Sequence, residues 1–455
     1  MSDHKEKEPE SSLNNAVRDG VFYSIMAGIG ETYLNPYALF LKATNTQIGL
    51  LAAIPPLLGV LFQLPAVRIL NRLRDRKRVI LLGVGLQACM WLPILSLPFL
   101  FESTGITLLI AAVAAYFIFG NVATPAWNSL MGDLVPPETR GSYFARRTRI
   151  MSIGTFAALV AGGVILQVAK DLQWTALGFA AIFLIAFCAR GVSAWYLSRM
   201  VDPPYPFHEK NDFSLREFLS QTRHSNFARF VLYTGVIHFS VMIAGPFFTV
   251  FMLRDLHFSY LQFMASSAVS VLFQFLILQH WGKFGDRFGN KKLLVVTGLL
   301  LPVIPWLWLA SPNFYYILGI QMIAGAVWAG FSLCIGNFVF DAVPAPLRAK
   351  SVAIYHLTNA GGAFLGALLG GWMTRHLPQS FTLFGMTWTL ISNLQWLFFI
   401  SGLLRLGFAG IFLPMIREVR DVEPLTVRDL IFRVSQIRPF SGLRFDLFTG
   451  NRKEK

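Results

Sequence analysis

The chain has 455 residues, of which 55% are hydrophobic and 14% are charged, and its mean hydropathy is +0.54. A soluble protein of this length is rarely so apolar, so the composition indicates an integral membrane protein. The net charge of +15 does not indicate a nucleic-acid-binding protein, because no basic patch is interleaved with aromatic residues that would be exposed.

The first 19 residues are polar and contain no apolar core, so they are not a cleavable signal peptide and are expected to form a flexible cytoplasmic tail. Twelve apolar runs follow, each long enough to cross a hydrocarbon core of about 30 Å as a helix. They are expected at 20–42, 46–67, 79–100, 105–132, 148–169 and 174–198 in the first half, and at 227–253, 258–281, 292–311, 313–340, 350–374 and 385–415 in the second. The runs are continuously apolar, which favours helices over alternating barrel strands. The predicted fold is therefore all-α and membrane-embedded, with two six-helix bundles at 20–198 and 227–415.

Two polar segments are each expected to carry a short amphipathic helix. One is the linker at 199–226, where Ser214-Leu-Arg-Glu217 forms a capping-box pattern. The other is the C-terminal tail at 416–455, where Thr426-Val-Arg-Asp429 begins a run with one apolar face. Either helix could lie on the cytoplasmic membrane surface or pack against the helix bundle.

The positions of Lys and Arg predict the orientation of the chain. When the N-terminus is assigned to the cytoplasm, the opposite side of the membrane receives only Lys42, Lys170, Arg254 and Arg375 of the 39 basic residues. By the positive-inside rule, both termini are expected in the cytoplasm, with the protein in the inner or plasma membrane. The positive net charge is then mostly a consequence of topology.

The sequence contains no signature of a bound cofactor or of an enzyme. The three cysteines, Cys89, Cys188 and Cys334, lie inside predicted spans without the spacing of metal ligands, and are expected to pack as small apolar residues. No Ser/His/Asp order, metal-ligand cluster or phosphate-cradling glycine loop stands at a plausible site. We therefore expect no metal and no direct coupling to ATP, which leaves a proton or sodium gradient as the energy source.

Two loop motifs suggest how the chain is organised. The first motif occurs twice, as Asp133, Pro136 and Arg140 after the fourth span and as Asp341, Pro344 and Arg348 after the tenth. Duplicated helical halves that hold a ligand between them are an architecture of secondary transporters. The second motif, Gly282-Lys-Phe-Gly285-Asp286-Arg287-Phe-Gly289, lies between spans 8 and 9. Its glycines permit a tight turn, its Asp can cap a neighbouring helix, and its Arg can pair with a carboxylate.

These motifs and the layout of six plus six spans resemble the major facilitator superfamily over nearly the whole chain. The resemblance implies that the second motif belongs to a charge network that latches one conformation of the two halves. By position, Asp286 is then expected to meet the cytoplasmic start of span 5, near Arg146 to Arg149. Arg287 is expected to pair with Asp341.

The equivalent loop of the first half departs from this pattern. Arg72 stands where Asp286 stands in the second half, and an arginine cannot cap a helix N-terminus. We expect Arg72 or Arg74 to pair with Asp133 instead, which would hold the loop to its own half. The alternative is that these arginines only satisfy the positive-inside bias.

Glu31 lies near the centre of span 1 and is the acid farthest from either predicted membrane surface. A charge at a helix centre costs about 3 kcal/mol on insertion scales, so Glu31 is expected to face a cavity or a partner. Burial favours the neutral form of a carboxyl group, which suits a proton-coupling site. The alternative is a fixed structural pair with Arg190 on span 6 or Arg405 on span 12.

The superfamily places spans 1, 4, 7 and 10 around its central cavity, and polar residues occur on all four. The candidates for lining a substrate site are Ser24 and Asn35 on span 1, Asn121, Thr124 and Asn128 on span 4, Trp328 and Ser332 on span 10, and the pair His356 and Asn359 on span 11. His238 on span 7 is a second candidate for relaying protons. For each of these residues, packing or bridging between helices is the structural alternative.

The predicted function is a secondary active transporter that moves a small organic solute by alternating access, with Glu31 and His238 as proton-coupling residues. The expected partners are the solute and the lipid bilayer, with no nucleic acid, and the expected state is a monomer. Efflux of amphipathic compounds of the multidrug type is one alternative. A membrane enzyme or a non-transporting receptor on the same fold is another.

Overall fold

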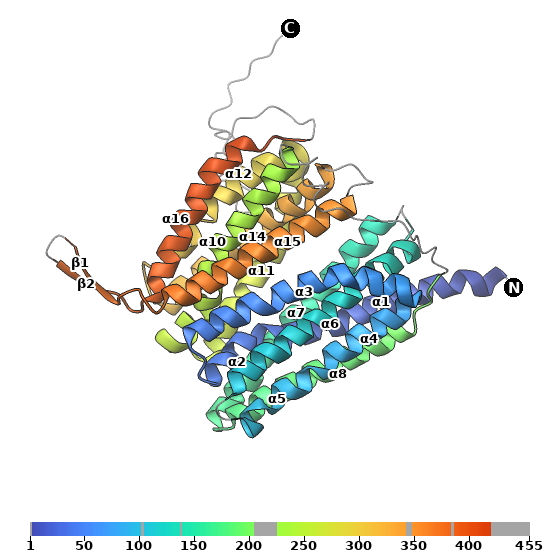
Figure 1. The fold of residues 1–455 in the computed structure, drawn as a ribbon, viewed down its shortest axis with the longest axis horizontal. Coiled ribbons are helices and arrows are strands. Elements are labelled where there is room, and N and C mark those ends of the chain that lie inside the picture. Colours follow the sequence, from blue (N-terminus) through green and yellow to red (C-terminus); the bar gives the residue numbers. More distant parts are fainter. Residues whose placement is uncertain are drawn as a thin grey trace, which may run out of the picture.

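The computed structural model describes residues 2–101, 104–136, 139–203, 225–342, 348–383 and 386–419. Its helices form two groups, one from each half of the chain (Figure 1). Apart from one small hairpin, the described secondary structure is helical, so the prediction of an all-α fold is confirmed. The predicted helices in the linker and in the C-terminal tail lie outside the described residues.

The first half contains α1 (Ser2–Ile29), the 3-10 turn η1 (Glu31–Tyr33), α2 (Leu34–Phe40), α3 (Asn45–Leu73), α4 (Arg76–Cys89), α5 (Trp91–Leu100), α6 (Gly105–Leu134), α7 (Arg140–Asp171) and α8 (Thr175–Ser198). The second half contains α10 (Asn226–Val250), the π-helical turn η2 (Phe251–Asp255), α11 (Tyr260–Phe288), α12 (Asn290–Leu300), α13 (Val303–Leu307), α14 (Phe314–Asp341), α15 (Arg348–Met373), β1 (Ser380–Leu383), β2 (Met386–Thr389), α16 (Leu394–Phe412) and η4 (Leu413–Met415). Within the described residues, eleven helical stretches are long and apolar enough to cross a membrane.

The first predicted span, at 20–42, is not one continuous helix. α1 ends at Ile29, and η1 and α2 follow as short separate turns. Pro36 has no N–H, so the carbonyl of Thr32 cannot receive its usual helical hydrogen bond at this point. The break places Glu31 at the first position of a tight turn rather than in the middle of a regular helix.

The N-terminal end of α1 also differs from the expectation of a flexible tail. Residues 10–19 are helical, and Ser12 and Asp19 are buried with at most 3% of their surface exposed. Ser12 Oγ accepts a hydrogen bond of 3.0 Å from the N–H of Val201, beyond the end of α8. This part of the chain therefore packs against the helix bundle.

The last predicted span, at 385–415, begins later than expected. The helix α16 starts at Leu394, and the residues before it form the β1–β2 hairpin, in which Phe381 pairs with Trp388. Phe381, Trp388 and their neighbours are as apolar as a membrane helix, so hydropathy alone extended the span too far. In Figure 1 the hairpin projects away from the helices.

The loops after the first and seventh spans share a local structure that supports duplication of the chain. Thr44 and Gln47 form a capping box at the start of α3, and Ser259 and Gln262 form the same box at the start of α11. In both loops the residue two positions before the cap adopts a positive φ. This residue is Lys42 in the first half and His257 in the second. The two halves therefore repeat a detailed turn as well as a helix order.

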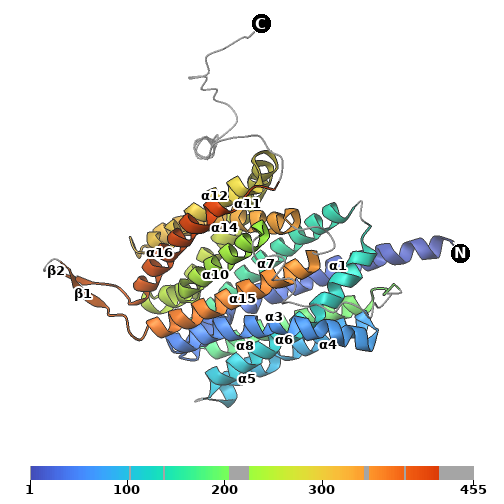
Figure 2. The same ribbon diagram turned by 45° about the horizontal axis from the view of Figure 1, so that its top comes forward.

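The two halves meet at the end of the molecule that carries these loops. Hydrogen bonds between described residues of the two halves lie here: Arg254 to Asn45 at 2.7 Å, Thr46 to the carbonyl of Gly371 at 3.3 Å, and the N–H of Leu261 to Gln167 at 3.4 Å. Two views show the ribbons of the halves converging near α2 and spreading apart toward the N-terminus (Figure 1 and Figure 2). The contacts thus join the halves at the end opposite to the N-terminus.

Candidate functional site

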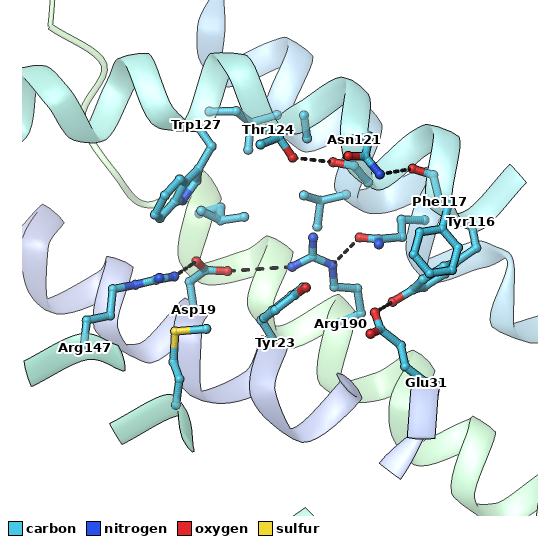
Figure 3. A pocket seen from close by; sticks show the side chains of 17 residues that line it. Asp19, Tyr23, Glu31, Tyr116, Phe117, Asn121, Thr124, Trp127, Arg147 and Arg190 are labelled. Atoms are coloured by element: carbon cyan, nitrogen blue, oxygen red, sulfur yellow. Dashed lines mark hydrogen bonds and ion pairs between the residues drawn. The ribbon is translucent and has the colours of Figure 1, made fainter. Parts of the chain in front are cut away.

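A cavity of about 300 Å³ lies inside the first half, lined by residues of α1, η1, α4, α6, α7 and α8. Its lining combines charged groups with aromatic rings (Figure 3). Two carboxyl groups, from Asp19 and Glu31, and two guanidinium groups, from Arg147 and Arg190, face it. The site is therefore a charged cavity between helices that are distant in sequence, most of them long and apolar enough to cross a membrane.

Asp19 anchors one end of the charged cluster. Its carboxylate accepts a hydrogen bond of 2.6 Å from Ser193 Oγ and one of 3.3 Å from Arg147 Nη2, and it lies 4.0 Å from Arg190 Nη1. Arg147 also donates to the carbonyl of Ala16 and lies 4.7 Å from the ring centroid of Trp127. One buried carboxylate thus holds arginines from two different helices.

Arg190 lies at the centre of the cavity. Its Nε donates to Gln87 Oε1 at 2.9 Å, its Nη1 donates to Ser193 Oγ at 2.9 Å, and its Cζ lies 4.9 Å from the ring centroid of Tyr23. Side chains from α1, α4 and α8 therefore fix the plane of the guanidinium group. Such a fixed group can bind a carboxylate or phosphate with little loss of side-chain entropy.

Glu31 lies on the other side of Arg190 from Asp19 (Figure 3). Tyr116 on α6 donates its hydroxyl to Glu31 Oε1 at 2.5 Å. Neither Arg190 nor Arg405 is within ion-pair distance of Glu31 in the described part of the chain, so the fixed pairing considered from the sequence is absent there. One carboxyl oxygen of Glu31 is left for a proton or a ligand.

Amide and hydroxyl groups of α6 complete the lining. Asn121 accepts a hydrogen bond of 2.6 Å from Gln63 on α3 and donates to the carbonyl of Phe117. Thr124 donates to the carbonyl of Gly120. Asn121 therefore bridges two helices and also lines the cavity. The two interpretations drawn from the sequence, a bridge between helices and a residue that lines a site, are compatible.

The other predicted lining residues lie elsewhere. Ser24 is buried against α7 and donates to the carbonyl of Val21, while Asn128 is exposed. Asn35 lies in α2, past the break, and does not line the cavity. Ser24 and Asn35 do not share one helix face with Glu31, because the helix is interrupted at Gly30.

The predicted residues of the second half do not line this cavity either. His238 Nδ1 is 2.8 Å from the carbonyl of Thr234, and Asn359 is buried on α15. Trp328 contacts Phe331 edge to face, Ser332 is exposed, and His356 lies against the ring of Tyr355. The structure brings Glu31, Asn121 and Thr124 together and leaves these residues on the other half.

The loop motif of the first half is anchored by Arg76, not by Arg72 or Arg74. The Arg76 side chain has no exposed surface and pairs with Asp133 at 2.5 Å and with Asp202 at 2.7 Å. It also donates to Ser129 and to the carbonyl of Pro203. The expectation that Asp133 pairs with Arg72 or Arg74 is therefore wrong, because Arg76 starts α4 and points into the bundle.

The loop motif of the second half contains the predicted tight turn. Gly289 has φ 91°, a conformation that L side chains rarely adopt, and its N–H donates to the carbonyl of Gly285. The structure shows no ion pair between Asp286 and Arg146 or Arg149, all of which are described. The side chains of Arg140, Asp341 and Arg348 lie outside the described residues, so the pairing of Arg287 with Asp341 remains a prediction.

The sequence analysis missed several residues that line the cavity, among them Asp19, Arg147 and Tyr116. Asp19 was assigned to a flexible tail because the residues around it are polar. A signal was present, since Ser12, Asn15 and Asp19 follow helical spacing and all three are buried. Their partners on α7 and α8 could not be identified from local spacing.

Two related halves made of helices long enough to cross a membrane are an architecture of secondary membrane transporters. The family model described as Major Facilitator Superfamily matches the chain twice, at residues 20–235 and 230–446. The chain belongs to this superfamily and, by family, is a multi-pass membrane transporter.

One curated relative and several solved structures resemble the chain. The uncharacterized MFS-type transporter YuxJ of Bacillus subtilis (strain 168) is 25% identical over 125 residues, which are 28% of this chain and 32% of that protein. The chain thus matches about a third of this relative's length.

The solved structures share the fold at low sequence identity. The nucleoside transporter NupG has a TM-score of 0.66 and 14% identity, covering 89% of this chain and 99% of its own. A D-xylose-proton symporter has a TM-score of 0.63 and 13% identity over 91% of this chain and 99% of its own. An inward-facing, occupied bacterial homolog of the human lysosomal transporter Spinster has a TM-score of 0.61 and 17% identity over 80% of this chain and 82% of its own.

Proposed function

We propose that the protein moves a small organic solute across the membrane by alternating access and that proton binding at Glu31 drives this movement. The observation that carries the proposal is the carboxyl group of Glu31, which lines the cavity and has, among the described residues, only a tyrosine hydroxyl as its hydrogen-bond partner. Such a group can exchange a proton with the cavity without breaking an ion pair. A structural neighbour is named a proton symporter, which is compatible with this proposal.

The arrangement of the two halves supports alternating access. Because the hydrogen bonds between their described residues lie at one end, a rocking movement that breaks these bonds would open that end. Glu31 on η1 and its partner Tyr116 on α6 both belong to the first half, so the proposed proton site would move with that half. We further propose that the protein acts as a monomer in the inner or plasma membrane with both termini in the cytoplasm.

The proposal is tested with purified protein in vesicles loaded with a pH-sensitive dye. A solute is first selected from a panel of metabolites by its ability to raise the melting temperature, since a ligand of the folded state stabilises it. Adding that solute should move protons in the wild type and should not do so in Glu31→Gln. Asp171→Asn, an acid-to-amide change outside the cavity, should behave as the wild type.

The expected loss in Glu31→Gln is at least about tenfold in solute-driven proton movement, because the amide carries no exchangeable acid proton at this site. The pH dependence of uptake should flatten in the same variant. If both transport and its pH dependence persist in Glu31→Gln, proton coupling at Glu31 is wrong.

A further inference from the structure

We propose that the solute is a small organic anion, which binds beside Arg190 when Glu31 carries a proton. This inference rests on the proposed function, because it assigns a substrate class to the same cavity. It follows from the charges that the cavity contains, from the free donor of Arg190 and from the aromatic rings around it.

The charged groups of the cavity balance only in one protonation state. The titratable and charged groups that face Glu31 come from every helix packed around it: Asp19 and Tyr23 from α1, Tyr116 from α6, Arg147 from α7 and Arg190 from α8, while α4 contributes the neutral Gln87. Two guanidinium groups carry two positive charges, and the two carboxylates, when ionised, cancel them. The charges that line the cavity therefore cancel when both Asp19 and Glu31 are ionised.

Protonation of Glu31 leaves one positive charge in excess. An uncompensated charge in a membrane-embedded site is costly, so a second negative charge is favoured there. An anionic solute supplies that charge, and the loaded cavity is neutral again. A cationic solute has the opposite effect, because it would add a positive charge to a site that is already neutral when Glu31 is ionised.

The geometry identifies where the anion binds. Arg190 uses Nε on Gln87 and Nη1 on Ser193, and in the described part of the chain its Nη2 has no hydrogen-bond partner. Gln87 and Ser193 act as positioning residues that hold the guanidinium plane. A carboxylate or phosphate oxygen is the acceptor that suits such a donor.

The rest of the lining restricts the anion further. The rings of Tyr23, Phe117 and Trp127 line the same cavity of about 300 Å³, a volume at the low end for small-molecule sites. The cavity thus suits an anion that also has an aromatic or apolar part. We chose benzoate, benzamide and benzylamine as probes, because they share one ring and differ in charge.

The experiment measures binding to the purified full-length protein in detergent at pH 5.5 and pH 8.0. Probes are the three benzene derivatives and matched sets of aliphatic and aromatic carboxylates, amides and amines. Only carboxylates should raise the melting temperature, and their apparent affinity should fall as the pH rises, by up to about tenfold per pH unit for one linked proton. Stabilisation by amines or amides at equal concentration, or by none of the carboxylates, overturns the proposal.

Variants separate this inference from the proposed coupling. Glu31→Gln imitates the protonated acid, so carboxylate binding should remain and become independent of pH. Arg190→Gln should weaken carboxylate binding at least about tenfold, and Arg190→Lys should restore part of it. Arg199→Gln, at the residue that directly follows the same helix and outside the cavity, is the matched control.

The outcomes are distinguishable. Carboxylate binding that is independent of pH in the wild type would contradict the proton site at Glu31 and leave the anion site intact. A different outcome is that neutral or cationic probes bind and that the pH dependence of their binding is lost in Glu31→Gln. This outcome would contradict the proposal that the solute is an anion and leave proton coupling at Glu31 intact. If Arg190→Gln does not fold, the anion proposal is still tested by comparing the binding of carboxylates, amides and amines to the wild type and to Arg190→Lys.

Discussion

Two arginines in the last α-helix of each half, Arg190 in α8 and Arg405 in α16, have different surroundings. Arg190 has Asp19, Gln87 and Ser193, whereas Arg405 donates to the carbonyl of Leu301 and its buried Nε has no partner among the described residues. That carbonyl lacks its usual helical donor because the residue four positions later, Pro305, has no N–H. Among the described residues, a buried carboxylate therefore lies beside Arg190 and none forms an ion pair with Arg405.

The pairing of Asp19 is predicted to matter for stability. Asp19→Asn keeps the hydrogen bond from Ser193 but leaves two buried guanidinium groups without a carboxylate, which should cost about 3 kcal/mol. The melting temperature of the detergent-purified protein should fall by several degrees. Asp255→Asn, in the pair with the half-exposed Arg254, should cost at most about 1 kcal/mol. Equal losses in the two variants would contradict the role of Asp19.

At the scale of elements, short polar segments fasten long helices to one another. Arg76 at the start of α4 holds Asp133 near the end of α6 and Asp202 after α8, so one side chain joins three helix ends. In the second half, Glu418 after η4 accepts from the N–H of Lys291 at the start of α12, much as Asp202 accepts from the N–H of Lys77. In both halves, a carboxylate that follows the last helix thus accepts a hydrogen bond from a backbone N–H at the start of an earlier helix.

Removal of Arg76 should loosen this junction. Arg76→Gln leaves Asp133 and Asp202 without their shared partner, and we expect a loss of about 3 to 5 kcal/mol and faster proteolysis near the ends of α6 and α8. Arg72→Gln changes an exposed arginine of the same loop and should have no measurable effect. Limited proteolysis and thermal melting check both variants. Similar sensitivity of the two variants would show that Arg76 is not the anchor.

At the scale of the molecule, the two halves are joined by packing at one end. Tyr33 and Phe179 of the first half contact Phe263 and Tyr260 of the second, close to the hydrogen bonds that join the halves. The contact between α3 and α15 is part of the same end. Alternating access requires this end to separate, so fixing it should stop transport.

A disulfide between α3 and α15 tests this requirement. A Cβ at Gly371 would lie 3.3 Å from Cα of Thr46, so Thr46→Cys and Gly371→Cys come within disulfide range once this tight contact relaxes by a few tenths of an ångström. In a background without the three native cysteines, oxidation should reduce transport by more than about tenfold, and reduction should restore it. Each single cysteine variant serves as the control. Transport at the normal rate with the disulfide formed would exclude separation of this end.

The sequence by itself determined the membrane class and the helical fold in two related halves, and it identified Glu31 as an acid inside an apolar run, which the structure places in the lining of the cavity. These features depend on long apolar runs, on loop motifs and on a charge inside such a run, and all of them are local in the chain. It also located Asn121 and Thr124, because both fall on one face of a single continuous helix.

Only the tertiary structure decided which residues share the cavity. Asp19 meets Arg147 and Arg190 because α1 packs against α7 and α8, and nothing in the spacing along α1 says which helices it faces. The break at Gly30 likewise changed the face on which Glu31 lies. A buried charge requires partners, and in a helix bundle those partners come from other helices, so their identity depends on packing and not on local sequence.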